Sequence, residues 1–111
     1  MSRNKALLDL ALEYLSQFGT VTHDLSLYNG PKKHSISFLL IVQGLLVGVW
    51  VLDWKCSVGT KKIIHIEQII QRSNLHGGFI VANSFSANAK ELAKSTKTLE
   101  LIARAEILYQ G

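Results

Sequence analysis

Cysteine and proline are almost missing from this sequence of 111 residues. Cys56 is the single cysteine, so no disulfide can form within the chain, and such usage is typical of a reducing cytoplasm. Cys56 also lacks a partner at zinc-ligand spacing, and the histidines are too scattered to provide one. The single proline, Pro31, falls in an Asn-Gly-Pro turn. No repeat, linker or low-complexity segment divides the chain, so we expect one domain over residues 1–111.

Acidic residues are fewer than basic ones. The chain has 12 lysines and arginines against 8 acids, which gives a net charge of +4 and a pI near 9.4. This balance permits a polyanionic partner without requiring one. Glycine loops of the P-loop or dinucleotide type are absent, so we expect no small-molecule cofactor. The hydrophobic content of 48% predicts a folded chain.

A long hydrophobic run is present, but it is shorter than a typical membrane span. Residues 36–52 contain one strongly polar side chain, Gln43, and a spanning helix needs about 20 residues. Gln43-Gly44 is a turn signal near the middle, with strand-forming residues on both sides. The run therefore predicts a β-hairpin, and no membrane association is expected. Two acids inside the apolar N-terminal stretch also argue against a signal peptide.

The second half of this run, Gly44–Lys55 (GLLVGVWVLDWK), predicts the central strand of a sheet. Its apolar, β-branched and aromatic residues would be covered on both faces. Alternation places Val49, Val51, Asp53 and Lys55 on one face, and Trp50, Leu52 and Trp54 on the other. Both tryptophans are expected in the core. A carboxylate and an ammonium would thus emerge together at the end of a buried strand.

Periodicity predicts helices and strands on both sides of this strand. The expected helices are 3–18, 61–74, 86–94 and 103–109, with Thr60 and Ser86 as candidate caps. The expected strands are 20–28, 35–42, 78–82 and 98–102. A three-stranded meander followed by helical crossovers predicts an α/β fold, with a mixed β-sheet flanked by helices on both faces.

Residues 49–93 resemble the Mrr-type branch of the restriction-endonuclease-like, or PD-(D/E)xK, superfamily. The matching features are a strand ending in acid-x-Lys, a glycine loop with a helix, the GGFIVA strand, and Ser84-Phe85-Ser86 before an alanine-rich helix. The first helix and the closing LELIARAEIL fit the same scheme. The small archaeal Holliday-junction resolvases are similar more distantly. The resemblance implies an αβββαβ core.

The same resemblance implies a chemistry. Members of the superfamily hydrolyse a phosphodiester with Mg²⁺ held by two carboxylates, and a lysine steadies the attacking water or the developing charge. Asp53 matches the acid of the third strand, and Lys55 matches the lysine. The acid of the second strand would fall at about Ser37, with Ser35 as the other position. Neither serine can act as an anionic ligand.

Three acids elsewhere in the chain could replace the missing carboxylate. The resemblance favours Glu67, because in this superfamily the second carboxylate can lie on the helix after the central strand. The candidate catalytic residues are then Asp53, Lys55 and Glu67. Asp53 and Glu67 would be the Mg²⁺ ligands. Asp24 lies one strand earlier, and Glu13 on the first helix matches an acid of related resolvases. Each could instead be an exposed surface charge. Asp53 with Lys55 could equally be an inherited ion pair.

Basic residues are concentrated in two predicted loop regions. They could form a phosphate-contacting rim if both loops lie at the same end of the sheet. The set is Lys32, Lys33, Lys61, Lys62 and Arg72. Dispersed surface lysines are the alternative interpretation. DNA is the partner that the resemblance implies.

Three functions follow from these observations. The preferred hypothesis is a DNA-binding protein with a nuclease-like fold, degenerate with respect to Mrr-type endonucleases because it lacks the acid of the second strand. The second is an active Mg²⁺-dependent DNA endonuclease or junction nuclease with a relocated carboxylate. The third is a non-catalytic protein-interaction module, for which a homodimer is one arrangement.

Overall fold

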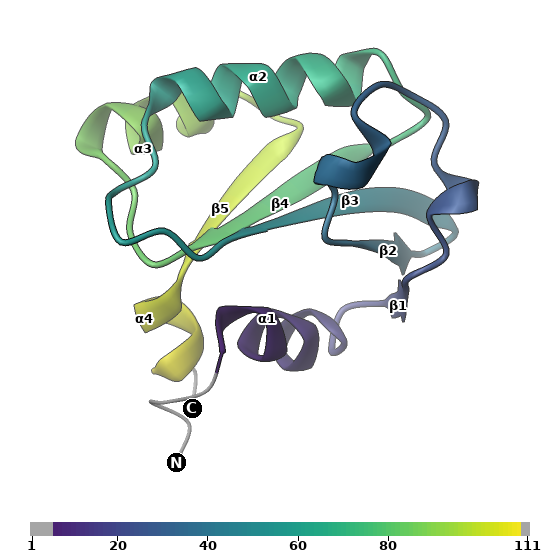
Figure 1. Ribbon diagram of the computed structural model, residues 1–111, viewed down its shortest axis with the longest axis horizontal. Helices are drawn as coiled ribbons and strands as arrows, with labels where there is room; N and C mark the ends of the chain where they lie inside the picture. Colours follow the sequence, from purple (N-terminus) through teal and green to yellow (C-terminus); the bar gives the residue numbers. More distant parts are fainter. Residues whose placement is uncertain (1–5, 110–111) are drawn as a thin grey trace.

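A five-stranded mixed sheet runs between two layers of helices (Figure 1). The computed structural model describes residues 6–109. The strands are β1 (Thr20–Thr22), β2 (Phe38–Val42), β3 (Leu45–Leu52), β4 (Gly77–Ala82) and β5 (Leu99–Ala103), and they lie in this order across the sheet. Neighbours from β1 to β3 pair antiparallel, whereas β3, β4 and β5 are parallel. The predicted α/β fold is confirmed, with β3 in the centre.

Each face of the sheet has its own helices and its own hydrophobic core (Figure 1). The helices α2 (Thr60–Gln71) and α3 (Ala87–Lys94) cover one face, where Trp50 packs with the isoleucines of α2. The helices α1 (Leu7–Leu15) and α4 (Arg104–Leu108) cover the other, where Val49 and Val81 pack with Leu7. The predicted placement of helices on both faces is therefore confirmed.

The strand β3 alternates between these two cores as its sequence predicts. Val49 and Trp50 are fully buried on opposite faces. The strand ends at Leu52, however, so Asp53 and Lys55 lie in the exposed loop beyond it. Trp54 is 39% exposed, and the Lys62 ammonium lies 5.9 Å from the centroid of its ring. The prediction that Trp54 belongs to the core is wrong, because the sheet no longer covers the chain at that point.

The hairpin between β2 and β3 is the predicted one. Gln43 and Gly44 have φ values of 52° and 81°. Two successive residues in the left-handed region form the tight turn whose twist matches that of an antiparallel hairpin. Within residues 6–109, no helix is long and apolar enough to cross a membrane.

Two of the predicted strands are shorter in the structure because local turns replace their ends. Asp24 Oδ1 accepts hydrogen bonds from the backbone N (3.1 Å) and Oγ (2.6 Å) of Ser26. These bonds cap a 3₁₀ turn, η2 (Leu25–Leu27), and so the strand predicted over residues 20–28 stops at Thr22. A second 3₁₀ turn, η3 (Lys33–Ser35), delays the start of β2 to Phe38.

The helix starts are predicted with mixed success. Ser86 caps α3 as expected, since its Oγ accepts a hydrogen bond from Ala89 N at 3.1 Å. Thr60 is not a cap: it is the first helical residue of α2, and Gly59 occupies the N-cap without a side-chain bond. The first helix ends at Leu15 instead of residue 18, and residues 3–5 of that prediction lie outside the described residues.

Candidate functional site

Three polar side chains meet where the parallel strands end. Asp53 follows β3, Asn83 follows β4, and Arg104 opens α4 directly after β5. Asn83 Nδ2 donates to Asp53 Oδ1 at 2.8 Å and to the Trp54 carbonyl at 2.9 Å. Arg104 Nε donates to Asn83 Oδ1 at 2.7 Å, and its Nη2 lies 3.8 Å from Asp53 Oδ1. We call these three residues the strand-end cluster.

The strand-end cluster surrounds the family-type acid with partners from the same chain. An amide N–H and a guanidinium both act on Asp53 Oδ1, and the Arg104 side chain is only 23% exposed. Asn83 is oriented from both sides, because its amide oxygen accepts from Arg104 while its nitrogen donates to Asp53. The negative charge of Asp53 is thus partly balanced by Arg104.

The two serines expected at the position of the second-strand acid have structural roles. Ser37 Oγ accepts a hydrogen bond from Val51 N at 3.0 Å, beside the end of β3. Ser35 Oγ accepts from Trp50 Nε1 at 3.3 Å and donates to the Lys32 carbonyl at 2.8 Å. Both hydroxyls therefore satisfy polar groups next to the central strand, and neither supplies a negative charge.

The structure does not join the other candidate acids to Asp53. Asp24 is engaged with Ser26, and the bonds from the Ser26 side chain and backbone lower the pKa of its carboxyl below the ordinary value of 3.8. Glu67 is half-buried on α2 and makes no hydrogen bond or ion pair through its carboxylate within residues 6–109. Glu13 is exposed on α1. No hydrogen bond within this range links Asp53 to any of them.

The donors at the end of β3 do not fit a magnesium ion. Mg²⁺ prefers near-octahedral oxygen coordination and gives up its water reluctantly, so two protein carboxylates are the usual minimum in this kind of site. Here Asp53 is the single acid of the strand-end cluster, and a guanidinium stands 3.8 Å from its oxygen. Among residues 6–109, no group of three or more His, Cys, Asp or Glu side chains could hold a metal ion.

Basic and polar side chains form a second feature, along the surface of α2. Lys61, His65, Gln68 and Arg72 are spaced by three or four residues and so follow one side of the helix. We call these four residues the α2 stripe. From Lys61 to Arg72 the stripe extends about 16 Å along the helix axis. The structure thus spreads the predicted basic residues along α2 instead of gathering them at one end of the sheet.

The loop before β2 adds a lysine to the α2 stripe. Lys32 has a left-handed backbone with φ 56°, and with Pro31 it faces α2 across a hollow of about 70 Å³. The remaining lining residues are His65, Gln68, Ile69 and Arg72. Three basic side chains from two distant segments therefore converge at one hollow. Lys33 lies on the same turn and adds a favourable charge for the Asp24 carboxylate.

The fold and the strand-end cluster together define an α/β domain of the nuclease-like class. The acid-x-Lys residues Asp53 and Lys55 directly follow its central strand, and helices cover both faces of the sheet. A family model described as "Restriction endonuclease", for the Mrr-type catalytic domain, matches residues 8–109. The chain therefore belongs to this Mrr-type restriction endonuclease family, and the resemblance is confirmed. Such domains are typically metal-dependent. No curated protein and no solved structure matches the chain.

Sequence reasoning missed several residues that the structure brings into these sites, of which three have side chains with a clear part in them. Asn83 and Arg104 carry the strand-end cluster, and His65 joins the hollow beside Lys32. Two of them had a usable signal. Polar residues that directly follow parallel strands meet at one edge of a sheet, and Asn83 and Arg104 both stand at such positions.

Proposed function

We propose that the protein binds DNA and does not cleave it. The proposal rests on the strand-end cluster: the acid of the nuclease motif, Asp53, is held by Asn83 and faces Arg104. The sequence match puts the second acid of a metal site at Ser37, with Ser35 as the other position, and both hydroxyls accept hydrogen bonds from groups of β3. The family links the domain to DNA, and its fold is retained although residues 6–109 contain no group of three or more His, Cys, Asp or Glu side chains that could hold a metal ion.

The surface that we assign to DNA is the α2 stripe with its neighbouring lysines. Arg72 and Lys32 line one hollow, while Lys61 and Lys62 open the helix about 16 Å away. Lys33 completes the set on the loop before β2. Side chains of this type bind phosphate oxygens independently of base sequence, and the resulting affinity falls with salt. We expect the protein to act in the cytoplasm, where its single thiol stays reduced.

The salt dependence of duplex binding tests this assignment. Simultaneous phosphate contacts by these five residues would give a slope of about −4.5 in log affinity against log salt concentration. Combining Lys32→Ala with Arg72→Ala leaves three of these contacts and should make the slope shallower, at about −2.7. The control is Lys97→Ala, because Lys97 is exposed but lies outside the stripe and its hollow. Binding can be followed by fluorescence anisotropy of a labelled duplex.

Two other results would favour the competing functions. If the wild-type protein does not bind duplex DNA at low salt, the interaction-module hypothesis is supported. If the salt slope is unchanged in the double variant, the DNA-binding surface lies elsewhere on the protein. The active-nuclease alternative has one structural observation in its favour, since the half-buried carboxylate of Glu67 is free of hydrogen bonds within residues 6–109. Cleavage assays separate that alternative from our proposal.

A further inference from the structure

One edge of the sheet is open. The strand β5 pairs with β4 on one side, and no other strand of the described chain pairs with it on the other. The Gly78 N–H donates to the Thr98 carbonyl at 2.8 Å. In a parallel ladder this bond turns the backbone groups of Glu100 and Ile102 toward β4 and those of Leu99 and Leu101 outward. The edge therefore offers two N–H and two C=O groups to a further strand.

The open edge ends at a defined point. Glu106 Oε1 accepts a hydrogen bond from Ala103 N at 3.1 Å, and this bond occupies the next outward N–H group. The free segment is therefore short, from Leu99 to Leu101. An extended peptide of about seven residues, at 3.3 Å per residue, spans this segment with room on each side.

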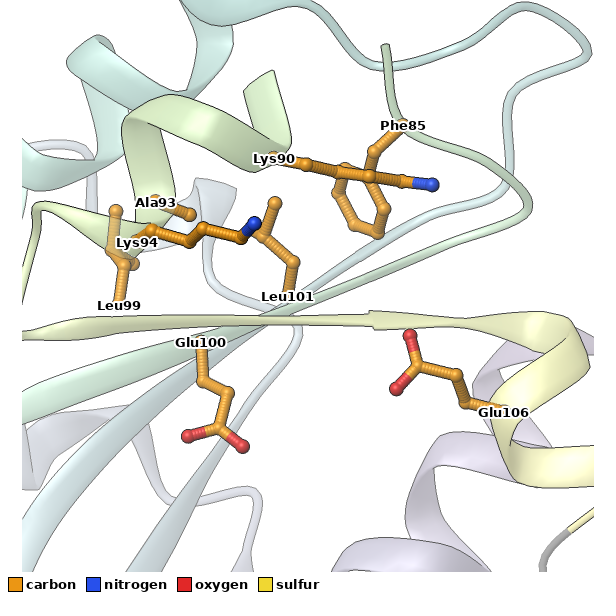
Figure 2. A pocket seen from close by; sticks show the side chains of 8 residues that line it. All are labelled: Phe85, Lys90, Ala93, Lys94, Leu99, Glu100, Leu101 and Glu106. Atoms are coloured by element: carbon orange, nitrogen blue, oxygen red, sulfur yellow. The ribbon is translucent and has the colours of Figure 1, made fainter. Parts of the chain in front are cut away.

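A groove lies beside this edge on the face of α3. It has a volume of about 450 Å³, and its apolar floor comes from Phe85, Ala93, Leu99 and Leu101. Lys90 and Lys94 extend from α3 over this floor, whereas Glu100 and Glu106 lie on the opposite side of β5 (Figure 2). The lining of the groove therefore combines this apolar floor with two ammonium groups on the α3 side and two carboxylates, Glu100 and Glu106, on the other side of β5.

The opposite face of the edge has the reverse charge. Glu100 points away from α3 (Figure 2). It lines a second hollow of about 260 Å³, together with Tyr14, Phe18, Val42, Phe79 and Ile102. The rings of Tyr14 and Phe18 meet edge to face, with centroids 5.4 Å apart. A carboxylate beside aromatic rings suits a cationic side chain.

We propose that β5 is a docking edge for an extended peptide with alternating charge. Such a peptide would add a sixth strand through the free backbone groups of Leu99 and Leu101. Its side chains on one face would be acidic or apolar and would contact Lys90, Lys94 and the apolar floor. The intervening side chains would be basic and would contact Glu100. This inference is independent of the proposed DNA-binding function.

The charges disfavour two other occupants. Antiparallel pairing of β5 with β5 of a second copy would place the lysines of both α3 helices on one face of a continuous sheet, and both Glu100 carboxylates on the other. Like charges facing each other across paired strands are destabilising. A nucleic acid backbone would contact the two lysines but would be repelled by Glu100 and Glu106. A peptide with alternating charge satisfies both faces.

Two synthetic peptides of equal composition test the proposal. In an extended strand, KDKLKDK places all its lysines on one face and both aspartates with the leucine on the other. KKDLDKK instead places both aspartates on a face with two lysines, and leaves the other two lysines with the leucine on the opposite face. We expect KDKLKDK to bind at least about tenfold more tightly, and to slow amide hydrogen exchange at Leu99 and Leu101, measured by NMR. Exchange at Glu100 and Ile102 should change little, because their N–H groups already bond to β4.

Charge reversal on α3 supplies the matched variants. Lys90→Glu should weaken KDKLKDK binding by about tenfold, whereas Lys97→Glu, at an exposed position outside the groove, should leave it unchanged. Absence of binding, equal binding of both peptides, or protection that spares Leu99 and Leu101 would overturn the proposal. A concentration-dependent dimer that protects these amides without peptide would also overturn the proposal. The same holds if Lys90→Glu lowers the affinity for DNA and leaves the affinity for the peptide unchanged.

Discussion

Asp53 has the residue type of a metal-binding carboxylate but different surroundings. Its oxygen is bonded to an amide and lies 3.8 Å from a guanidinium, so this side chain contributes to the connection between three strand ends. The contribution is modest, because the Asp53 side chain is 57% exposed. The strand-end cluster therefore positions the loop after β3, where Lys55 also lies, through hydrogen bonds within the chain.

Replacing Asp53 should lower the stability of the fold slightly, whereas DNA affinity should stay equal or rise. We expect Asp53→Ala to lower the free energy of unfolding by about 1 kcal/mol, since the Asn83 amide group loses one of its two acceptors and keeps only the Trp54 carbonyl. DNA affinity should stay equal or rise, because a negative charge is removed. Urea denaturation and anisotropy measure the two effects. Asp53→Asn is the control, as it keeps an acceptor oxygen; weaker DNA binding in both variants would assign Asp53 a direct role in the complex.

Asp24 gives a prediction on pH. Its pKa is lowered in the folded state by the bonds from Ser26, so its carboxylate stabilises the fold above the ordinary value of 3.8. That contribution is lost as the pH falls through the lower, folded pKa. Wild-type protein should therefore exceed Asp24→Ala in urea midpoint at pH 7, and the difference should shrink as the pH drops below 3.8. A difference that is constant from pH 7 to pH 3 would contradict this explanation.

At the scale of single elements, the packing of β3 on β4 depends on two glycines. The Trp50 ring lies against the backbone of both strands: a Cβ on Gly78 would stand 2.7 Å from this ring, and one on Gly48 would stand 2.9 Å from it. The GGFIVA sequence of β4 therefore provides room for the largest side chain of the core. Crowding of this kind forces the indole or the strands to shift.

Substitution of Gly78 tests that packing. We expect Gly78→Ala to lower the free energy of unfolding by about 1–3 kcal/mol, as overpacking does in other cores. Gly59→Ala is the matched control, because a Cβ there meets no atom within 4 Å. Thermal or urea unfolding gives both values. Equal stability of the two variants would show that the Trp50 ring moves away at no cost.

Elements with a regular hydrophobic pattern could be predicted from the sequence. Turns that depend on a local side-chain hydrogen bond could not. The apolar alternation of β3 and the turn at Gln43-Gly44 depend on neighbouring residues alone, and both were predicted correctly. Residues 23–28 have a strand-like pattern, but the Asp24 side chain bonds to Ser26 and ends the strand early. A side-chain bond of this type is decided by geometry that the hydrophobic pattern does not contain.

At the scale of the whole molecule, the candidate site was predictable only in part. Asp53 and Lys55 carry a local motif that sequence reasoning recognises, and the family match confirms the fold around them. Asn83 and Arg104 come from segments 30 and 51 residues later in the chain, and they join Asp53 only because three parallel strands end at one edge. Pairing across that distance needs the register of the sheet, which the sequence alone did not provide.

The whole molecule then presents three separate surfaces. The α2 stripe is basic, the strand-end cluster is balanced in charge, and the β5 edge is positive on one face and negative on the other. We propose that DNA binds at the α2 stripe and a peptide at the β5 edge, and no residue lining the hollow at the stripe also lines the groove at that edge. In this account the nuclease-like fold serves as a scaffold for binding, and the end of β3 is a structural connection instead of a reaction centre.

Incubation of the wild-type protein with supercoiled plasmid in the presence of Mn²⁺ or Mg²⁺ tests this central claim most directly. The account predicts that the plasmid is bound but stays supercoiled, because Asp53 without a second carboxylate cannot hold the ion where it would activate a water molecule. The contradicting result is metal-dependent nicking that disappears in both Asp53→Ala and Glu67→Ala while DNA binding is retained. That result would show that Glu67 supplies the second acid and that the protein is an active endonuclease.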